Sequence, residues 1–529
     1  MGRLLNPKRI TLYLAAAVLI GAGLLPLCVM FAASLSSLQN YTQTLGNART
    51  WMLFGNSLLL ATWTTAIAGV TGVTLGVLFS RTDLPFRNPL AVLFSVPILF
   101  PSYILAVGWF EVLGRSGLLA RWIHPSTGEV TSRWLFDLPG TVLVLSTTFL
   151  PVVLLLTMTY LQAVNPGLEE AARLSCGWPG VIKGITLPLI TPGIVLSLVL
   201  VFLLAMGEFG APAFLRFDVF PVASFTQFSA FYNFGAATAA AMPLVLVALL
   251  GLWVEQRVLR DKTYQFRWGG RQKNAARIGL GPAKPLLFIM VVLLAGVLVC
   301  VPLSALLWRG LSAGALGEAL ERAGASAIRS IGYAGVSASI LATLGFFLAY
   351  LVHRRAVPGW RWLDALTLLL FTLPGTVIGI GLILVWNRPV TNWIYATPTI
   401  VVIGYLGQYA ALSTQMILAG FSQLSPALEE AAEAAGAGWF SRLFRILVPL
   451  LWPAILVSWV VTFIFCLRDI SLPLLLAPPG RDTLTARTLT LMANGSPELI
   501  AALCLLSVIL TLIPLGVLGV AQRFWRPAA

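Results

Sequence analysis

The chain has 529 residues, of which 58% are hydrophobic and only 10% carry a charged side chain. This composition excludes an ordinary soluble protein, in which about a quarter of the residues are charged. The net charge of +15 would suit nucleic-acid binding, but in so apolar a chain an excess of Lys and Arg in cytoplasmic loops explains it better. We therefore predict a lipid bilayer as the surroundings and no nucleic-acid partner.

Twelve apolar stretches are long enough to cross a bilayer. A span takes about 20 residues, and it is helical because no backbone polar group can stay unpaired in hydrocarbon. The stretches form two sets of six: 10–30, 57–79, 90–110, 140–160, 189–207 and 236–254, then 285–307, 331–352, 363–386, 399–419, 450–467 and 499–518. The predicted fold class is an all-α membrane protein of about 12 transmembrane helices in two pseudo-symmetric six-helix halves.

One sustained polar stretch separates the two sets of helices. Between Gln256 and Lys284 it holds eight basic residues and a single acid, together with a Gly-Gly and a Gly-Pro step that break helices. We predict three segments: a first transmembrane domain over 1–256, a cytoplasmic basic linker over 257–284 and a second transmembrane domain over 285–529.

The distribution of basic residues predicts the orientation. If the linker and the N-terminus with Arg3, Lys8 and Arg9 are cytoplasmic, most of the Lys and Arg residues fall on that side, as the positive-inside rule requires. Both termini would then be cytoplasmic. Six helices per half also make the halves enter the membrane in the same sense, related by a two-fold axis along the membrane normal. A pathway is expected on that axis.

The most informative motif occurs twice, 260 residues apart. The first copy reads Asn-Pro-Gly-Leu-Glu-Glu-Ala-Ala from Asn165, and the second reads Ser-Pro-Ala-Leu-Glu-Glu-Ala-Ala from Ser425. Asn and Ser are good helix N-caps, Pro suits the first helical position, and acids are favoured in the first turn. In the second copy Gly436 is expected to end this helix, and a second short helix is expected from Trp439 to Leu447. Each copy therefore predicts a capped helix-turn-helix on the cytoplasmic surface, before the fifth helix of its half.

Further pairs of residues extend the repeat. Asn56-Ser57 opens the second span as Arg329-Ser330 opens the eighth, and Pro101 lies inside the third span as Pro374 lies inside the ninth. Glu208 matches Asp469 at the outer ends of the fifth and eleventh helices. These two acids could flank an outer gate of the substrate pathway, because charges near spans are costly and often functional. The alternative is simple capping of a helix end.

The repeated loops resemble the cytoplasmic loop of ABC importer permeases, in which Glu-Ala-Ala is followed by a glycine and later by a hydrophobic-Pro pair. The second copy fits this pattern well, whereas in the first Cys176 stands at the glycine position and Gly177 follows it. In that family the loop is the coupling helix, which docks on the ATP-binding subunit. The resemblance implies coupling loops formed by Glu169, Glu170, Ala171, Ala172, Gly177 and Pro188 in the first copy, and by Glu429, Glu430, Ala431, Ala432, Gly436 and Pro449 in the second.

The resemblance narrows further to the ferric-iron importer permeases of the bacterial inner membrane. It rests on two fused halves and on the segment from Leu467 to Leu484, which contains Arg-Asp-Ile-Ser and Ala-Pro-Pro-Gly. Fused thiamine and phosphonate permeases are close relatives, so those substrates stay open. The implied partners are two copies of an ATP-binding subunit and a periplasmic or lipid-anchored substrate-binding protein.

The chain has no Gly-x4-Gly-Lys-Ser/Thr phosphate loop, so ATP would be used by the partner and no cofactor is expected in this chain. No catalytic or metal-ligating cluster is predicted either, since the only histidines, His124 and His353, lie on opposite faces. His353, with Arg354 and Arg355, is interpreted as a solvated cytoplasmic cluster. The rival function is a secondary transporter with six-plus-six helices, against which the sequence offers no polar relay at mid-membrane.

Overall fold

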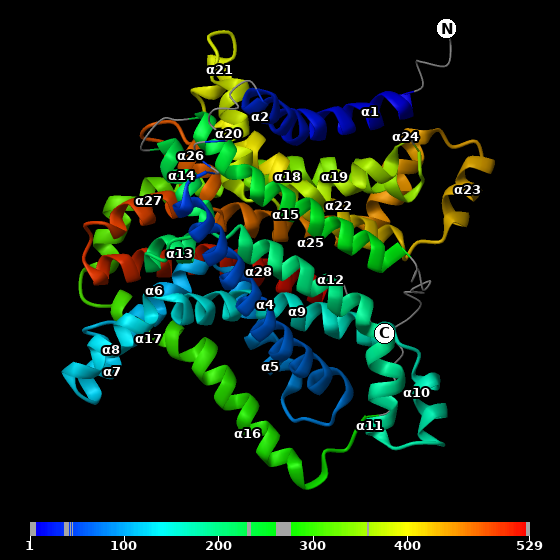
Figure 1. The fold of residues 1–529 in the computed structure, drawn as a ribbon. Coiled ribbons are helices and arrows are strands. Elements are labelled where there is room, and N and C mark those ends of the chain that lie inside the picture. The colour runs from blue at the N-terminus through cyan, green and yellow to red at the C-terminus, as the bar shows by residue number, and fades with distance from the viewer. Residues whose placement is uncertain are drawn as a thin grey trace.

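The computed structural model describes residues 7–35, 42, 44, 46–229, 234–260, 277–356 and 359–524. Within these ranges every named element is a helix, and the one β-type pairing is an isolated bridge between Thr82 and Ile278. Ten helices there are long and apolar enough to cross a membrane, or eleven if a bent pair counts as one span. The predicted all-α membrane fold is confirmed, and the long helices lie side by side with short helices at both ends (Figure 1).

The helices follow the predicted order in both halves. In the first half they are α1 (Pro7–Leu19), α2 (Leu25–Leu35), α4 (Ala48–Arg81), α5 (Arg87–Ser95), α6 (Ser102–Leu113), α7 (Leu118–Trp122), α8 (Pro125–Leu135), α9 (Leu138–Ala163), α10 (Pro166–Arg173), α11 (Trp178–Val181), α12 (Leu187–Met206), α13 (Gly210–Leu215), α14 (Phe220–Ser229) and α15 (Phe234–Arg260). In the second they are α16 (Lys284–Ala295), α17 (Val301–Gly310), α18 (Ala315–His353), α19 (Trp360–Thr372), α20 (Gly375–Trp386), α21 (Asn392–Tyr395), α22 (Thr399–Phe421), α23 (Pro426–Ala434), α24 (Trp439–Arg442), α25 (Val448–Arg468), α26 (Ser471–Leu476), α27 (Leu484–Met492) and α28 (Pro497–Phe524).

The third and ninth predicted spans are not continuous helices, which corrects the sequence prediction. The third is broken between a 3-10 turn, η2 (Val96–Leu99), and α6, and the ninth bends by 107° between α19 and α20. At each break a proline caps the following helix, and the residue before it is extended: Phe100 has ψ 152° and Leu373 has ψ 143°. The proline ring disfavours the helical conformation of the preceding residue, so Pro101 and Pro374 end one helix and start another.

Four other prolines sit in helices that continue, because a wider turn precedes each of them. The π turns η1 (Ile20–Leu24), η3 (Ile182–Thr186), η5 (Gly296–Cys300) and η6 (Leu443–Leu447) each end two residues before a proline. A proline has no N–H and its ring clashes with the carbonyl of the preceding turn, and a π turn relieves this. Pro188 and Pro449 therefore lie inside the continuous helical segments Trp178–Met206 and Trp439–Arg468. The expected separate short helix from Trp439 to Leu447 is instead the start of that second segment.

The two halves match at the level of single hydrogen bonds. In the first half Ser57 accepts from the Phe220 amide (2.8 Å) and Asn56 donates to the Asp218 carbonyl (3.0 Å). In the second half Ser330 accepts from the Leu484 amide (2.7 Å) and Arg329 donates to the Asp482 carbonyl (3.1 Å). The long helices α4 and α18 are thus tied in the same way to the short helices α14 and α27.

The first helix of each half packs on the other half. The Pro26 carbonyl on α2 lies against Gly381 of α20, and the Pro302 carbonyl on α17 lies against Gly108 of α6. An added Cβ would be 2.9 Å from the first oxygen and 2.6 Å from the second, so both positions need glycine. The predicted domains, 1–256 and 285–529, therefore each pack a first helix against the other domain.

Close helix packing inside each half also depends on a glycine. On α4, a Cβ at Gly72 would lie 2.7 Å from the Val153 side chain of α9, and on α18 a Cβ at Gly345 would lie 2.1 Å from Ser413 Oγ of α22. Gly345 follows Gly72 by 273 residues, as Ser330 follows Ser57. Small residues allow helices to approach closely in a membrane. This contact therefore belongs to the shared architecture of the two halves.

We expect Gly345→Leu to destabilise the folded protein by about 1–3 kcal/mol, because the new side chain overpacks the contact between α18 and α22. Gly332→Leu on the same helix is the matched control, since a Cβ there meets nothing within 4 Å. The measurement is the thermal unfolding midpoint of the two purified variants in the same detergent. A Gly345→Leu midpoint equal to that of Gly332→Leu would contradict the packing argument.

Candidate functional site

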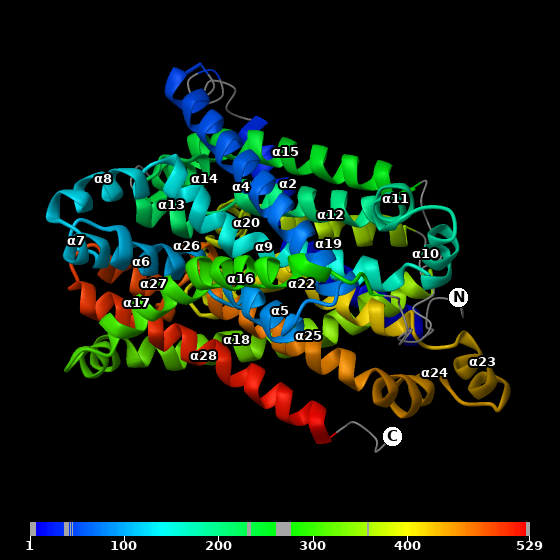
Figure 2. The same ribbon diagram turned by 90° about the horizontal axis from the view of Figure 1, so that it is seen from below.

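The two repeated loops lie at the same end of the molecule. Helices α10 and α11 of the first copy and α23 and α24 of the second project from this end, and α1 begins and α28 ends on the same side (Figures 1 and 2). We call it the loop end. The short helices α7, α8 and α21 lie at the opposite end. The structure thus brings together two surfaces that the sequence separates by 260 residues.

Both loops begin with the capped helix that the motif predicts. Asn165 is the N-cap of α10, and its side chain accepts a hydrogen bond from the Gly167 amide (3.0 Å). Ser425 occupies the same position before α23, but its side chain makes no capping hydrogen bond. The helix prediction is confirmed in both copies, while side-chain capping is confirmed only in the first.

The first glutamate of the first copy points into the protein. Glu169 is 2% exposed and lies 3.3 Å from the guanidinium of Arg81, the last residue of α4. Thr186 donates a hydrogen bond to the same carboxylate oxygen (2.8 Å). Arg81 also donates to the Leu161 carbonyl at the end of α9 (2.8 Å). A buried charge is stable only when paired and hydrogen-bonded, and this one is both.

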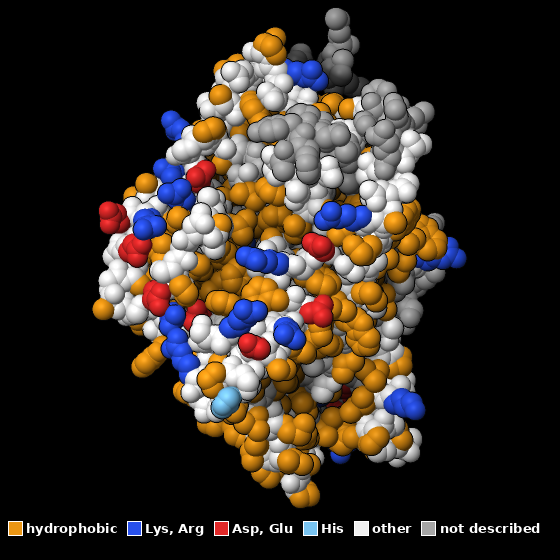
Figure 3. Space-filling view, turned by 60° about the vertical axis from the view of Figure 1, so that its left-hand side comes forward, with side chains coloured by type: hydrophobic (Ala, Val, Ile, Leu, Met, Phe, Trp, Pro, Cys, Tyr) orange, Lys and Arg blue, Asp and Glu red, His pale blue; other side chains and the backbone are white. Residues whose placement is uncertain are grey.

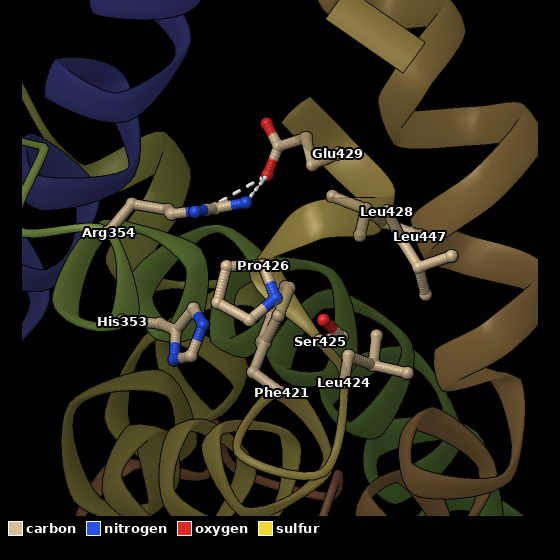
Figure 4. A pocket seen from close by; sticks show the side chains of 9 residues that line it. All are labelled: His353, Arg354, Phe421, Leu424, Ser425, Pro426, Leu428, Glu429 and Leu447. Atoms are coloured by element: carbon tan, nitrogen blue, oxygen red, sulfur yellow. Dashed lines mark hydrogen bonds and ion pairs between the residues drawn. The ribbon is translucent and has the colours of Figure 1, made fainter. Parts of the chain in front are cut away.

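The first glutamate of the second copy has a matching but different set of partners. Arg354, directly after α18, donates from Nε to Glu429 Oε2 (2.9 Å). Tyr350 donates to Oε1 (2.9 Å) and accepts from the indole of Trp439 (3.1 Å). Figure 4 shows the ion pair above a small pocket in which His353 lies beside Phe421. The two rings stack at 5.3 Å.

The two ion pairs are repeat equivalents. Arg354 follows Arg81 by the same 273 residues that separate Ser330 from Ser57, and Glu429 follows Glu169 by 260. Neither arginine was predicted to have a role, and the prediction that Arg354 belongs to a solvated cluster is wrong, because its side chain is 25% exposed and paired with Glu429. The sequence feature that could have predicted them is an arginine at the end of the long helix in each half, at an offset of 273 residues. The helix-end arginine looked like ordinary cytoplasmic loop charge.

The second glutamate of each pair points away from the protein. Glu170 and Glu430 are exposed, as are Ala171 and Ala431 beside them. The two helices also share a half-exposed leucine, Leu168 at 50% and Leu428 at 47%. Each loop therefore presents a carboxylate, a leucine and a thin alanine face to the outside.

The turns after the two helices differ. Gly436 adopts a left-handed conformation (φ +83°), which ends α23 as expected. In the first copy Gly177 has φ −71° and caps α11, the position that Gly438 takes before α24. Both connections have four residues, 174–177 and 435–438, whereas α10 has eight residues and α23 has nine. The first copy is therefore one residue shorter in its helix, and Gly177 corresponds to Gly438 rather than to Gly436. Cys176 is exposed in the turn of the first copy.

We expect Gly436→Ala to weaken the second loop by about 1–2 kcal/mol, because a side chain at positive φ strains the backbone. Gly177→Ala should be nearly neutral, since its backbone is in an ordinary extended conformation. Limited proteolysis of the two purified variants under native conditions measures the local opening of each loop. Equal cleavage rates in the two loops would contradict the assignment of the turns.

The acids proposed for an outer gate both cap a short helix. Glu208 accepts from the Gly210 amide (3.0 Å) and from the Ser102 hydroxyl (2.6 Å). Asp469 accepts from the Ser471 amide (3.1 Å), but its other oxygen is buried without a hydrogen-bond partner among the described residues. The difference arises because the residue in the second half that corresponds to Ser102 is Gly375, which has no hydroxyl group. Capping thus accounts for one hydrogen bond of each acid, and Glu208 accepts a second from Ser102 of α6.

The halves meet beside these two acids. Gly207, next to Glu208, lies against Pro374 at the break between α19 and α20, where an added Cβ would be 3.2 Å from the proline ring. Arg468, next to Asp469, donates to the Ile98 carbonyl of the first half. The broken third and ninth spans therefore bring Pro101 and Pro374 to the junction of the halves.

The described end of the linker is fastened beside the first loop. Asp83, two residues after Arg81, accepts from the Leu280 amide (3.0 Å) and pairs with Lys284 (2.9 Å). These two donors hold the pKa of Asp83 below its usual range. The Ile278 amide donates to the Arg81 carbonyl (2.8 Å). Linker residues 261–276 lie outside the described residues.

The end opposite the loops carries interspersed charges over apolar surface (Figure 3). Arg309 pairs with Glu498 (2.9 Å) and lies 3.6 Å from Glu111, so it joins α17 to α28 and α6. Arg322 pairs with Glu318 (2.9 Å) on α18. No group of three His, Cys, Asp or Glu residues that could hold a metal ion occurs in the described part of the chain.

Comparison with known proteins identifies the architecture. The model of the family described as "binding-protein-dependent transport system inner membrane component" matches residues 68–263 and again residues 341–526. Together these matches cover more than half of the chain, with one in each half. The chain belongs to this family. The permease therefore carries two fused copies of the family domain, and it is a multi-pass inner-membrane transport subunit rather than an enzyme.

The permease also resembles curated proteins along most of its length. It is 24% identical over 479 residues to the ferric transport system permease protein FbpB of Actinobacillus pleuropneumoniae, with 86% of this chain and 69% of the relative covered. It is 27% identical over 455 residues to the putative ferric transport system permease protein FbpB 1 of Haemophilus influenzae, with 79% and 68% covered. The sulfate transport system permease protein CysT of Escherichia coli matches 48% of the chain at 24% identity, with 93% of that relative covered.

Proposed function

We propose that the permease is the membrane subunit of an ATP-driven importer whose two loops each receive one copy of a separate ATP-binding subunit. The observation that carries this proposal is the pair of outward-facing surfaces around Glu170 and Glu430 at one end of the molecule. Two equivalent surfaces suit two copies of one partner. A periplasmic or lipid-anchored binding protein delivers the solute to the opposite end.

The loop end is cytoplasmic in this proposal. The start of α1 and the described end of the basic linker lie beside the loops, and positive residues mark the cytoplasmic side. The opposite end then faces the binding protein, and its interspersed Arg and Glu side chains offer complementary charges for docking (Figure 3).

The solute passes between the halves, near Glu208 and Asp469. Both acids lie where α12 and α25 end, next to the cross-half contacts of Gly207 and Arg468. Closure of the ATP-binding subunits pulls the loops together, and the halves rock about this junction. The pathway opens alternately to the two sides.

Ferric iron is the proposed solute, because the two ferric transport permeases match 86% and 79% of this chain, across both halves. The sulfate relative covers only one half. We assign selectivity to the binding protein, and among the described residues there is no group of three His, Cys, Asp or Glu side chains that could hold iron.

Uptake of radiolabelled ferric iron tests the solute. Cells that lack this chain, with their other iron systems disabled, should take up less iron than complemented cells at low external iron. Equal uptake in the two strains would remove iron as the solute, and thiamine and phosphonates would be tested next. Failure of an ATP-binding subunit to co-purify with the chain would contradict the importer function itself.

A further inference from the structure

The inner glutamates attach the loops to the longest helices of the protein. Arg81 is the last residue of α4, a helix of 34 residues, and Arg354 directly follows α18, a helix of 39. The loop helices themselves pack mainly on each other and on the following turn, α10 on α11 and α23 on α24. The pairs of Arg81 with Glu169 and of Arg354 with Glu429 are therefore direct links between each loop helix and a long helix.

The long helices reach from these links to the opposite end of the protein. From Arg81 back to Ser57 there are roughly 24 helical residues, a length of about 36 Å at 1.5 Å per residue. Ser57 holds the start of α14, and Ser330 on α18 holds the start of α27 in the same way. A displacement of a loop would thus be carried along a packed helix to the far end of its half.

The two links are built differently. The side chains of Arg81 and Glu169 are 5% and 3% exposed, whereas those of Arg354 and Glu429 are 25% and 9% exposed. The first is further fixed by the linker, because the Ile278 amide donates to the Arg81 carbonyl. The second depends on Tyr350 instead, whose position in the first half is taken by Val77. The second link is the more accessible of the two to experiment.

We propose that Arg81 and Arg354 are positioning residues for energy coupling, each fastening the helix that meets the ATP-binding subunit to the long helix of its half. This inference rests on the proposed function. It goes beyond docking, because it assigns the transmission of the movement to two ion pairs inside this chain. Loss of a link would let the ATP-binding subunit close without moving α4 or α18.

The test uses the complete complex in proteoliposomes: permease, ATP-binding subunits and binding protein. Solute transported per ATP hydrolysed is measured for wild type, Arg354→Lys and Arg354→Met. Lysine keeps the charge but not the fork of parallel donors, so we expect the ratio to fall in the order wild type, Lys, Met. For Arg354→Met the fall should be at least about fivefold, a typical loss of coupling between two sites. The matched control is Arg355→Met, the next residue along, which is exposed, contacts the Trp360 ring and forms no ion pair among the described residues.

The outcomes separate the two proposals. A reduced ratio for Arg354→Met, with the ATP-binding subunit retained in normal amount and Arg355→Met unchanged, supports the positioning role. A wild-type ratio for Arg354→Met overturns it. If Arg354→Met does not accumulate in the membrane, Arg354→Lys decides: a reduced ratio supports the role and a wild-type ratio overturns it. Transport by the wild-type complex without ATP hydrolysis would instead overturn the proposed function.

Discussion

Reversing the two outward-facing glutamates, in Glu170→Lys with Glu430→Lys, will abolish ATP-driven uptake while the protein still inserts into the membrane. Both side chains are exposed and neither forms an ion pair in the described structure, so folding does not depend on them. A charge reversed at a protein interface costs about 2–5 kcal/mol for each contact it breaks. Two such losses lower ATP-binding subunit occupancy far below what transport requires.

The measurement pairs uptake in cells with co-purification of the ATP-binding subunit. The control is Glu321→Lys, an exposed acid on α18 toward the opposite end, which should leave co-purification of the ATP-binding subunit unchanged. Each single reversal should reduce uptake less than the double reversal. Undiminished uptake by the double variant, at normal abundance, would show that the loops are not the docking surfaces.

Replacing Arg81 by Met will destabilise the protein more than replacing Arg354 by Met. The replacement leaves Glu169 buried without its counter-charge, which costs about 3–5 kcal/mol. Arg354→Met should cost less, because water reaches Arg354, whose side chain is 25% exposed against 5% for Arg81. Changing both partners, in Arg81→Met with Glu169→Leu, should restore most of the loss, since no unpaired charge remains.

Thermal unfolding of the purified variants in one detergent measures this order. The midpoint should be lowest for Arg81→Met, intermediate for Arg354→Met and closest to wild type for the double variant. Equal midpoints for the two single variants would contradict the difference in burial. A double variant as unstable as Arg81→Met would show that the ion pair is not the source of the effect.

Local patterns in the sequence were sufficient to predict the loops. The N-cap at Asn165, the helix after it and the left-handed Gly436 all follow from residue types at adjacent positions. The ion pairs were not predictable in that way. Arg81 lies 88 residues before Glu169, and Arg354 lies 75 before Glu429. Because the two offsets of the repeat differ, the motif alignment alone could not connect them.

Hydropathy predicted where apolar helices occur but not where they break. A window of about 20 apolar residues averages over Pro101 and Pro374, although the backbone before each proline is extended. A proline at the same place in both halves was the available signal. The contacts of Glu208 and Asp469 could not be predicted from the sequence, because they depend on whether Ser102 or Gly375 lies opposite the carboxylate. The functional role of the loop residues stays a prediction.

Cysteine cross-linking between each loop and the ATP-binding subunit is the most direct test of the two-loop account. Glu170→Cys and Glu430→Cys would be made separately in a chain whose exposed cysteines, Cys28, Cys176 and Cys300, are replaced by serine. Each variant should cross-link one ATP-binding subunit carrying a single cysteine, and the combined variant should cross-link two. A combined variant that captures only one subunit, or none, would contradict the claim that both loops are docking sites.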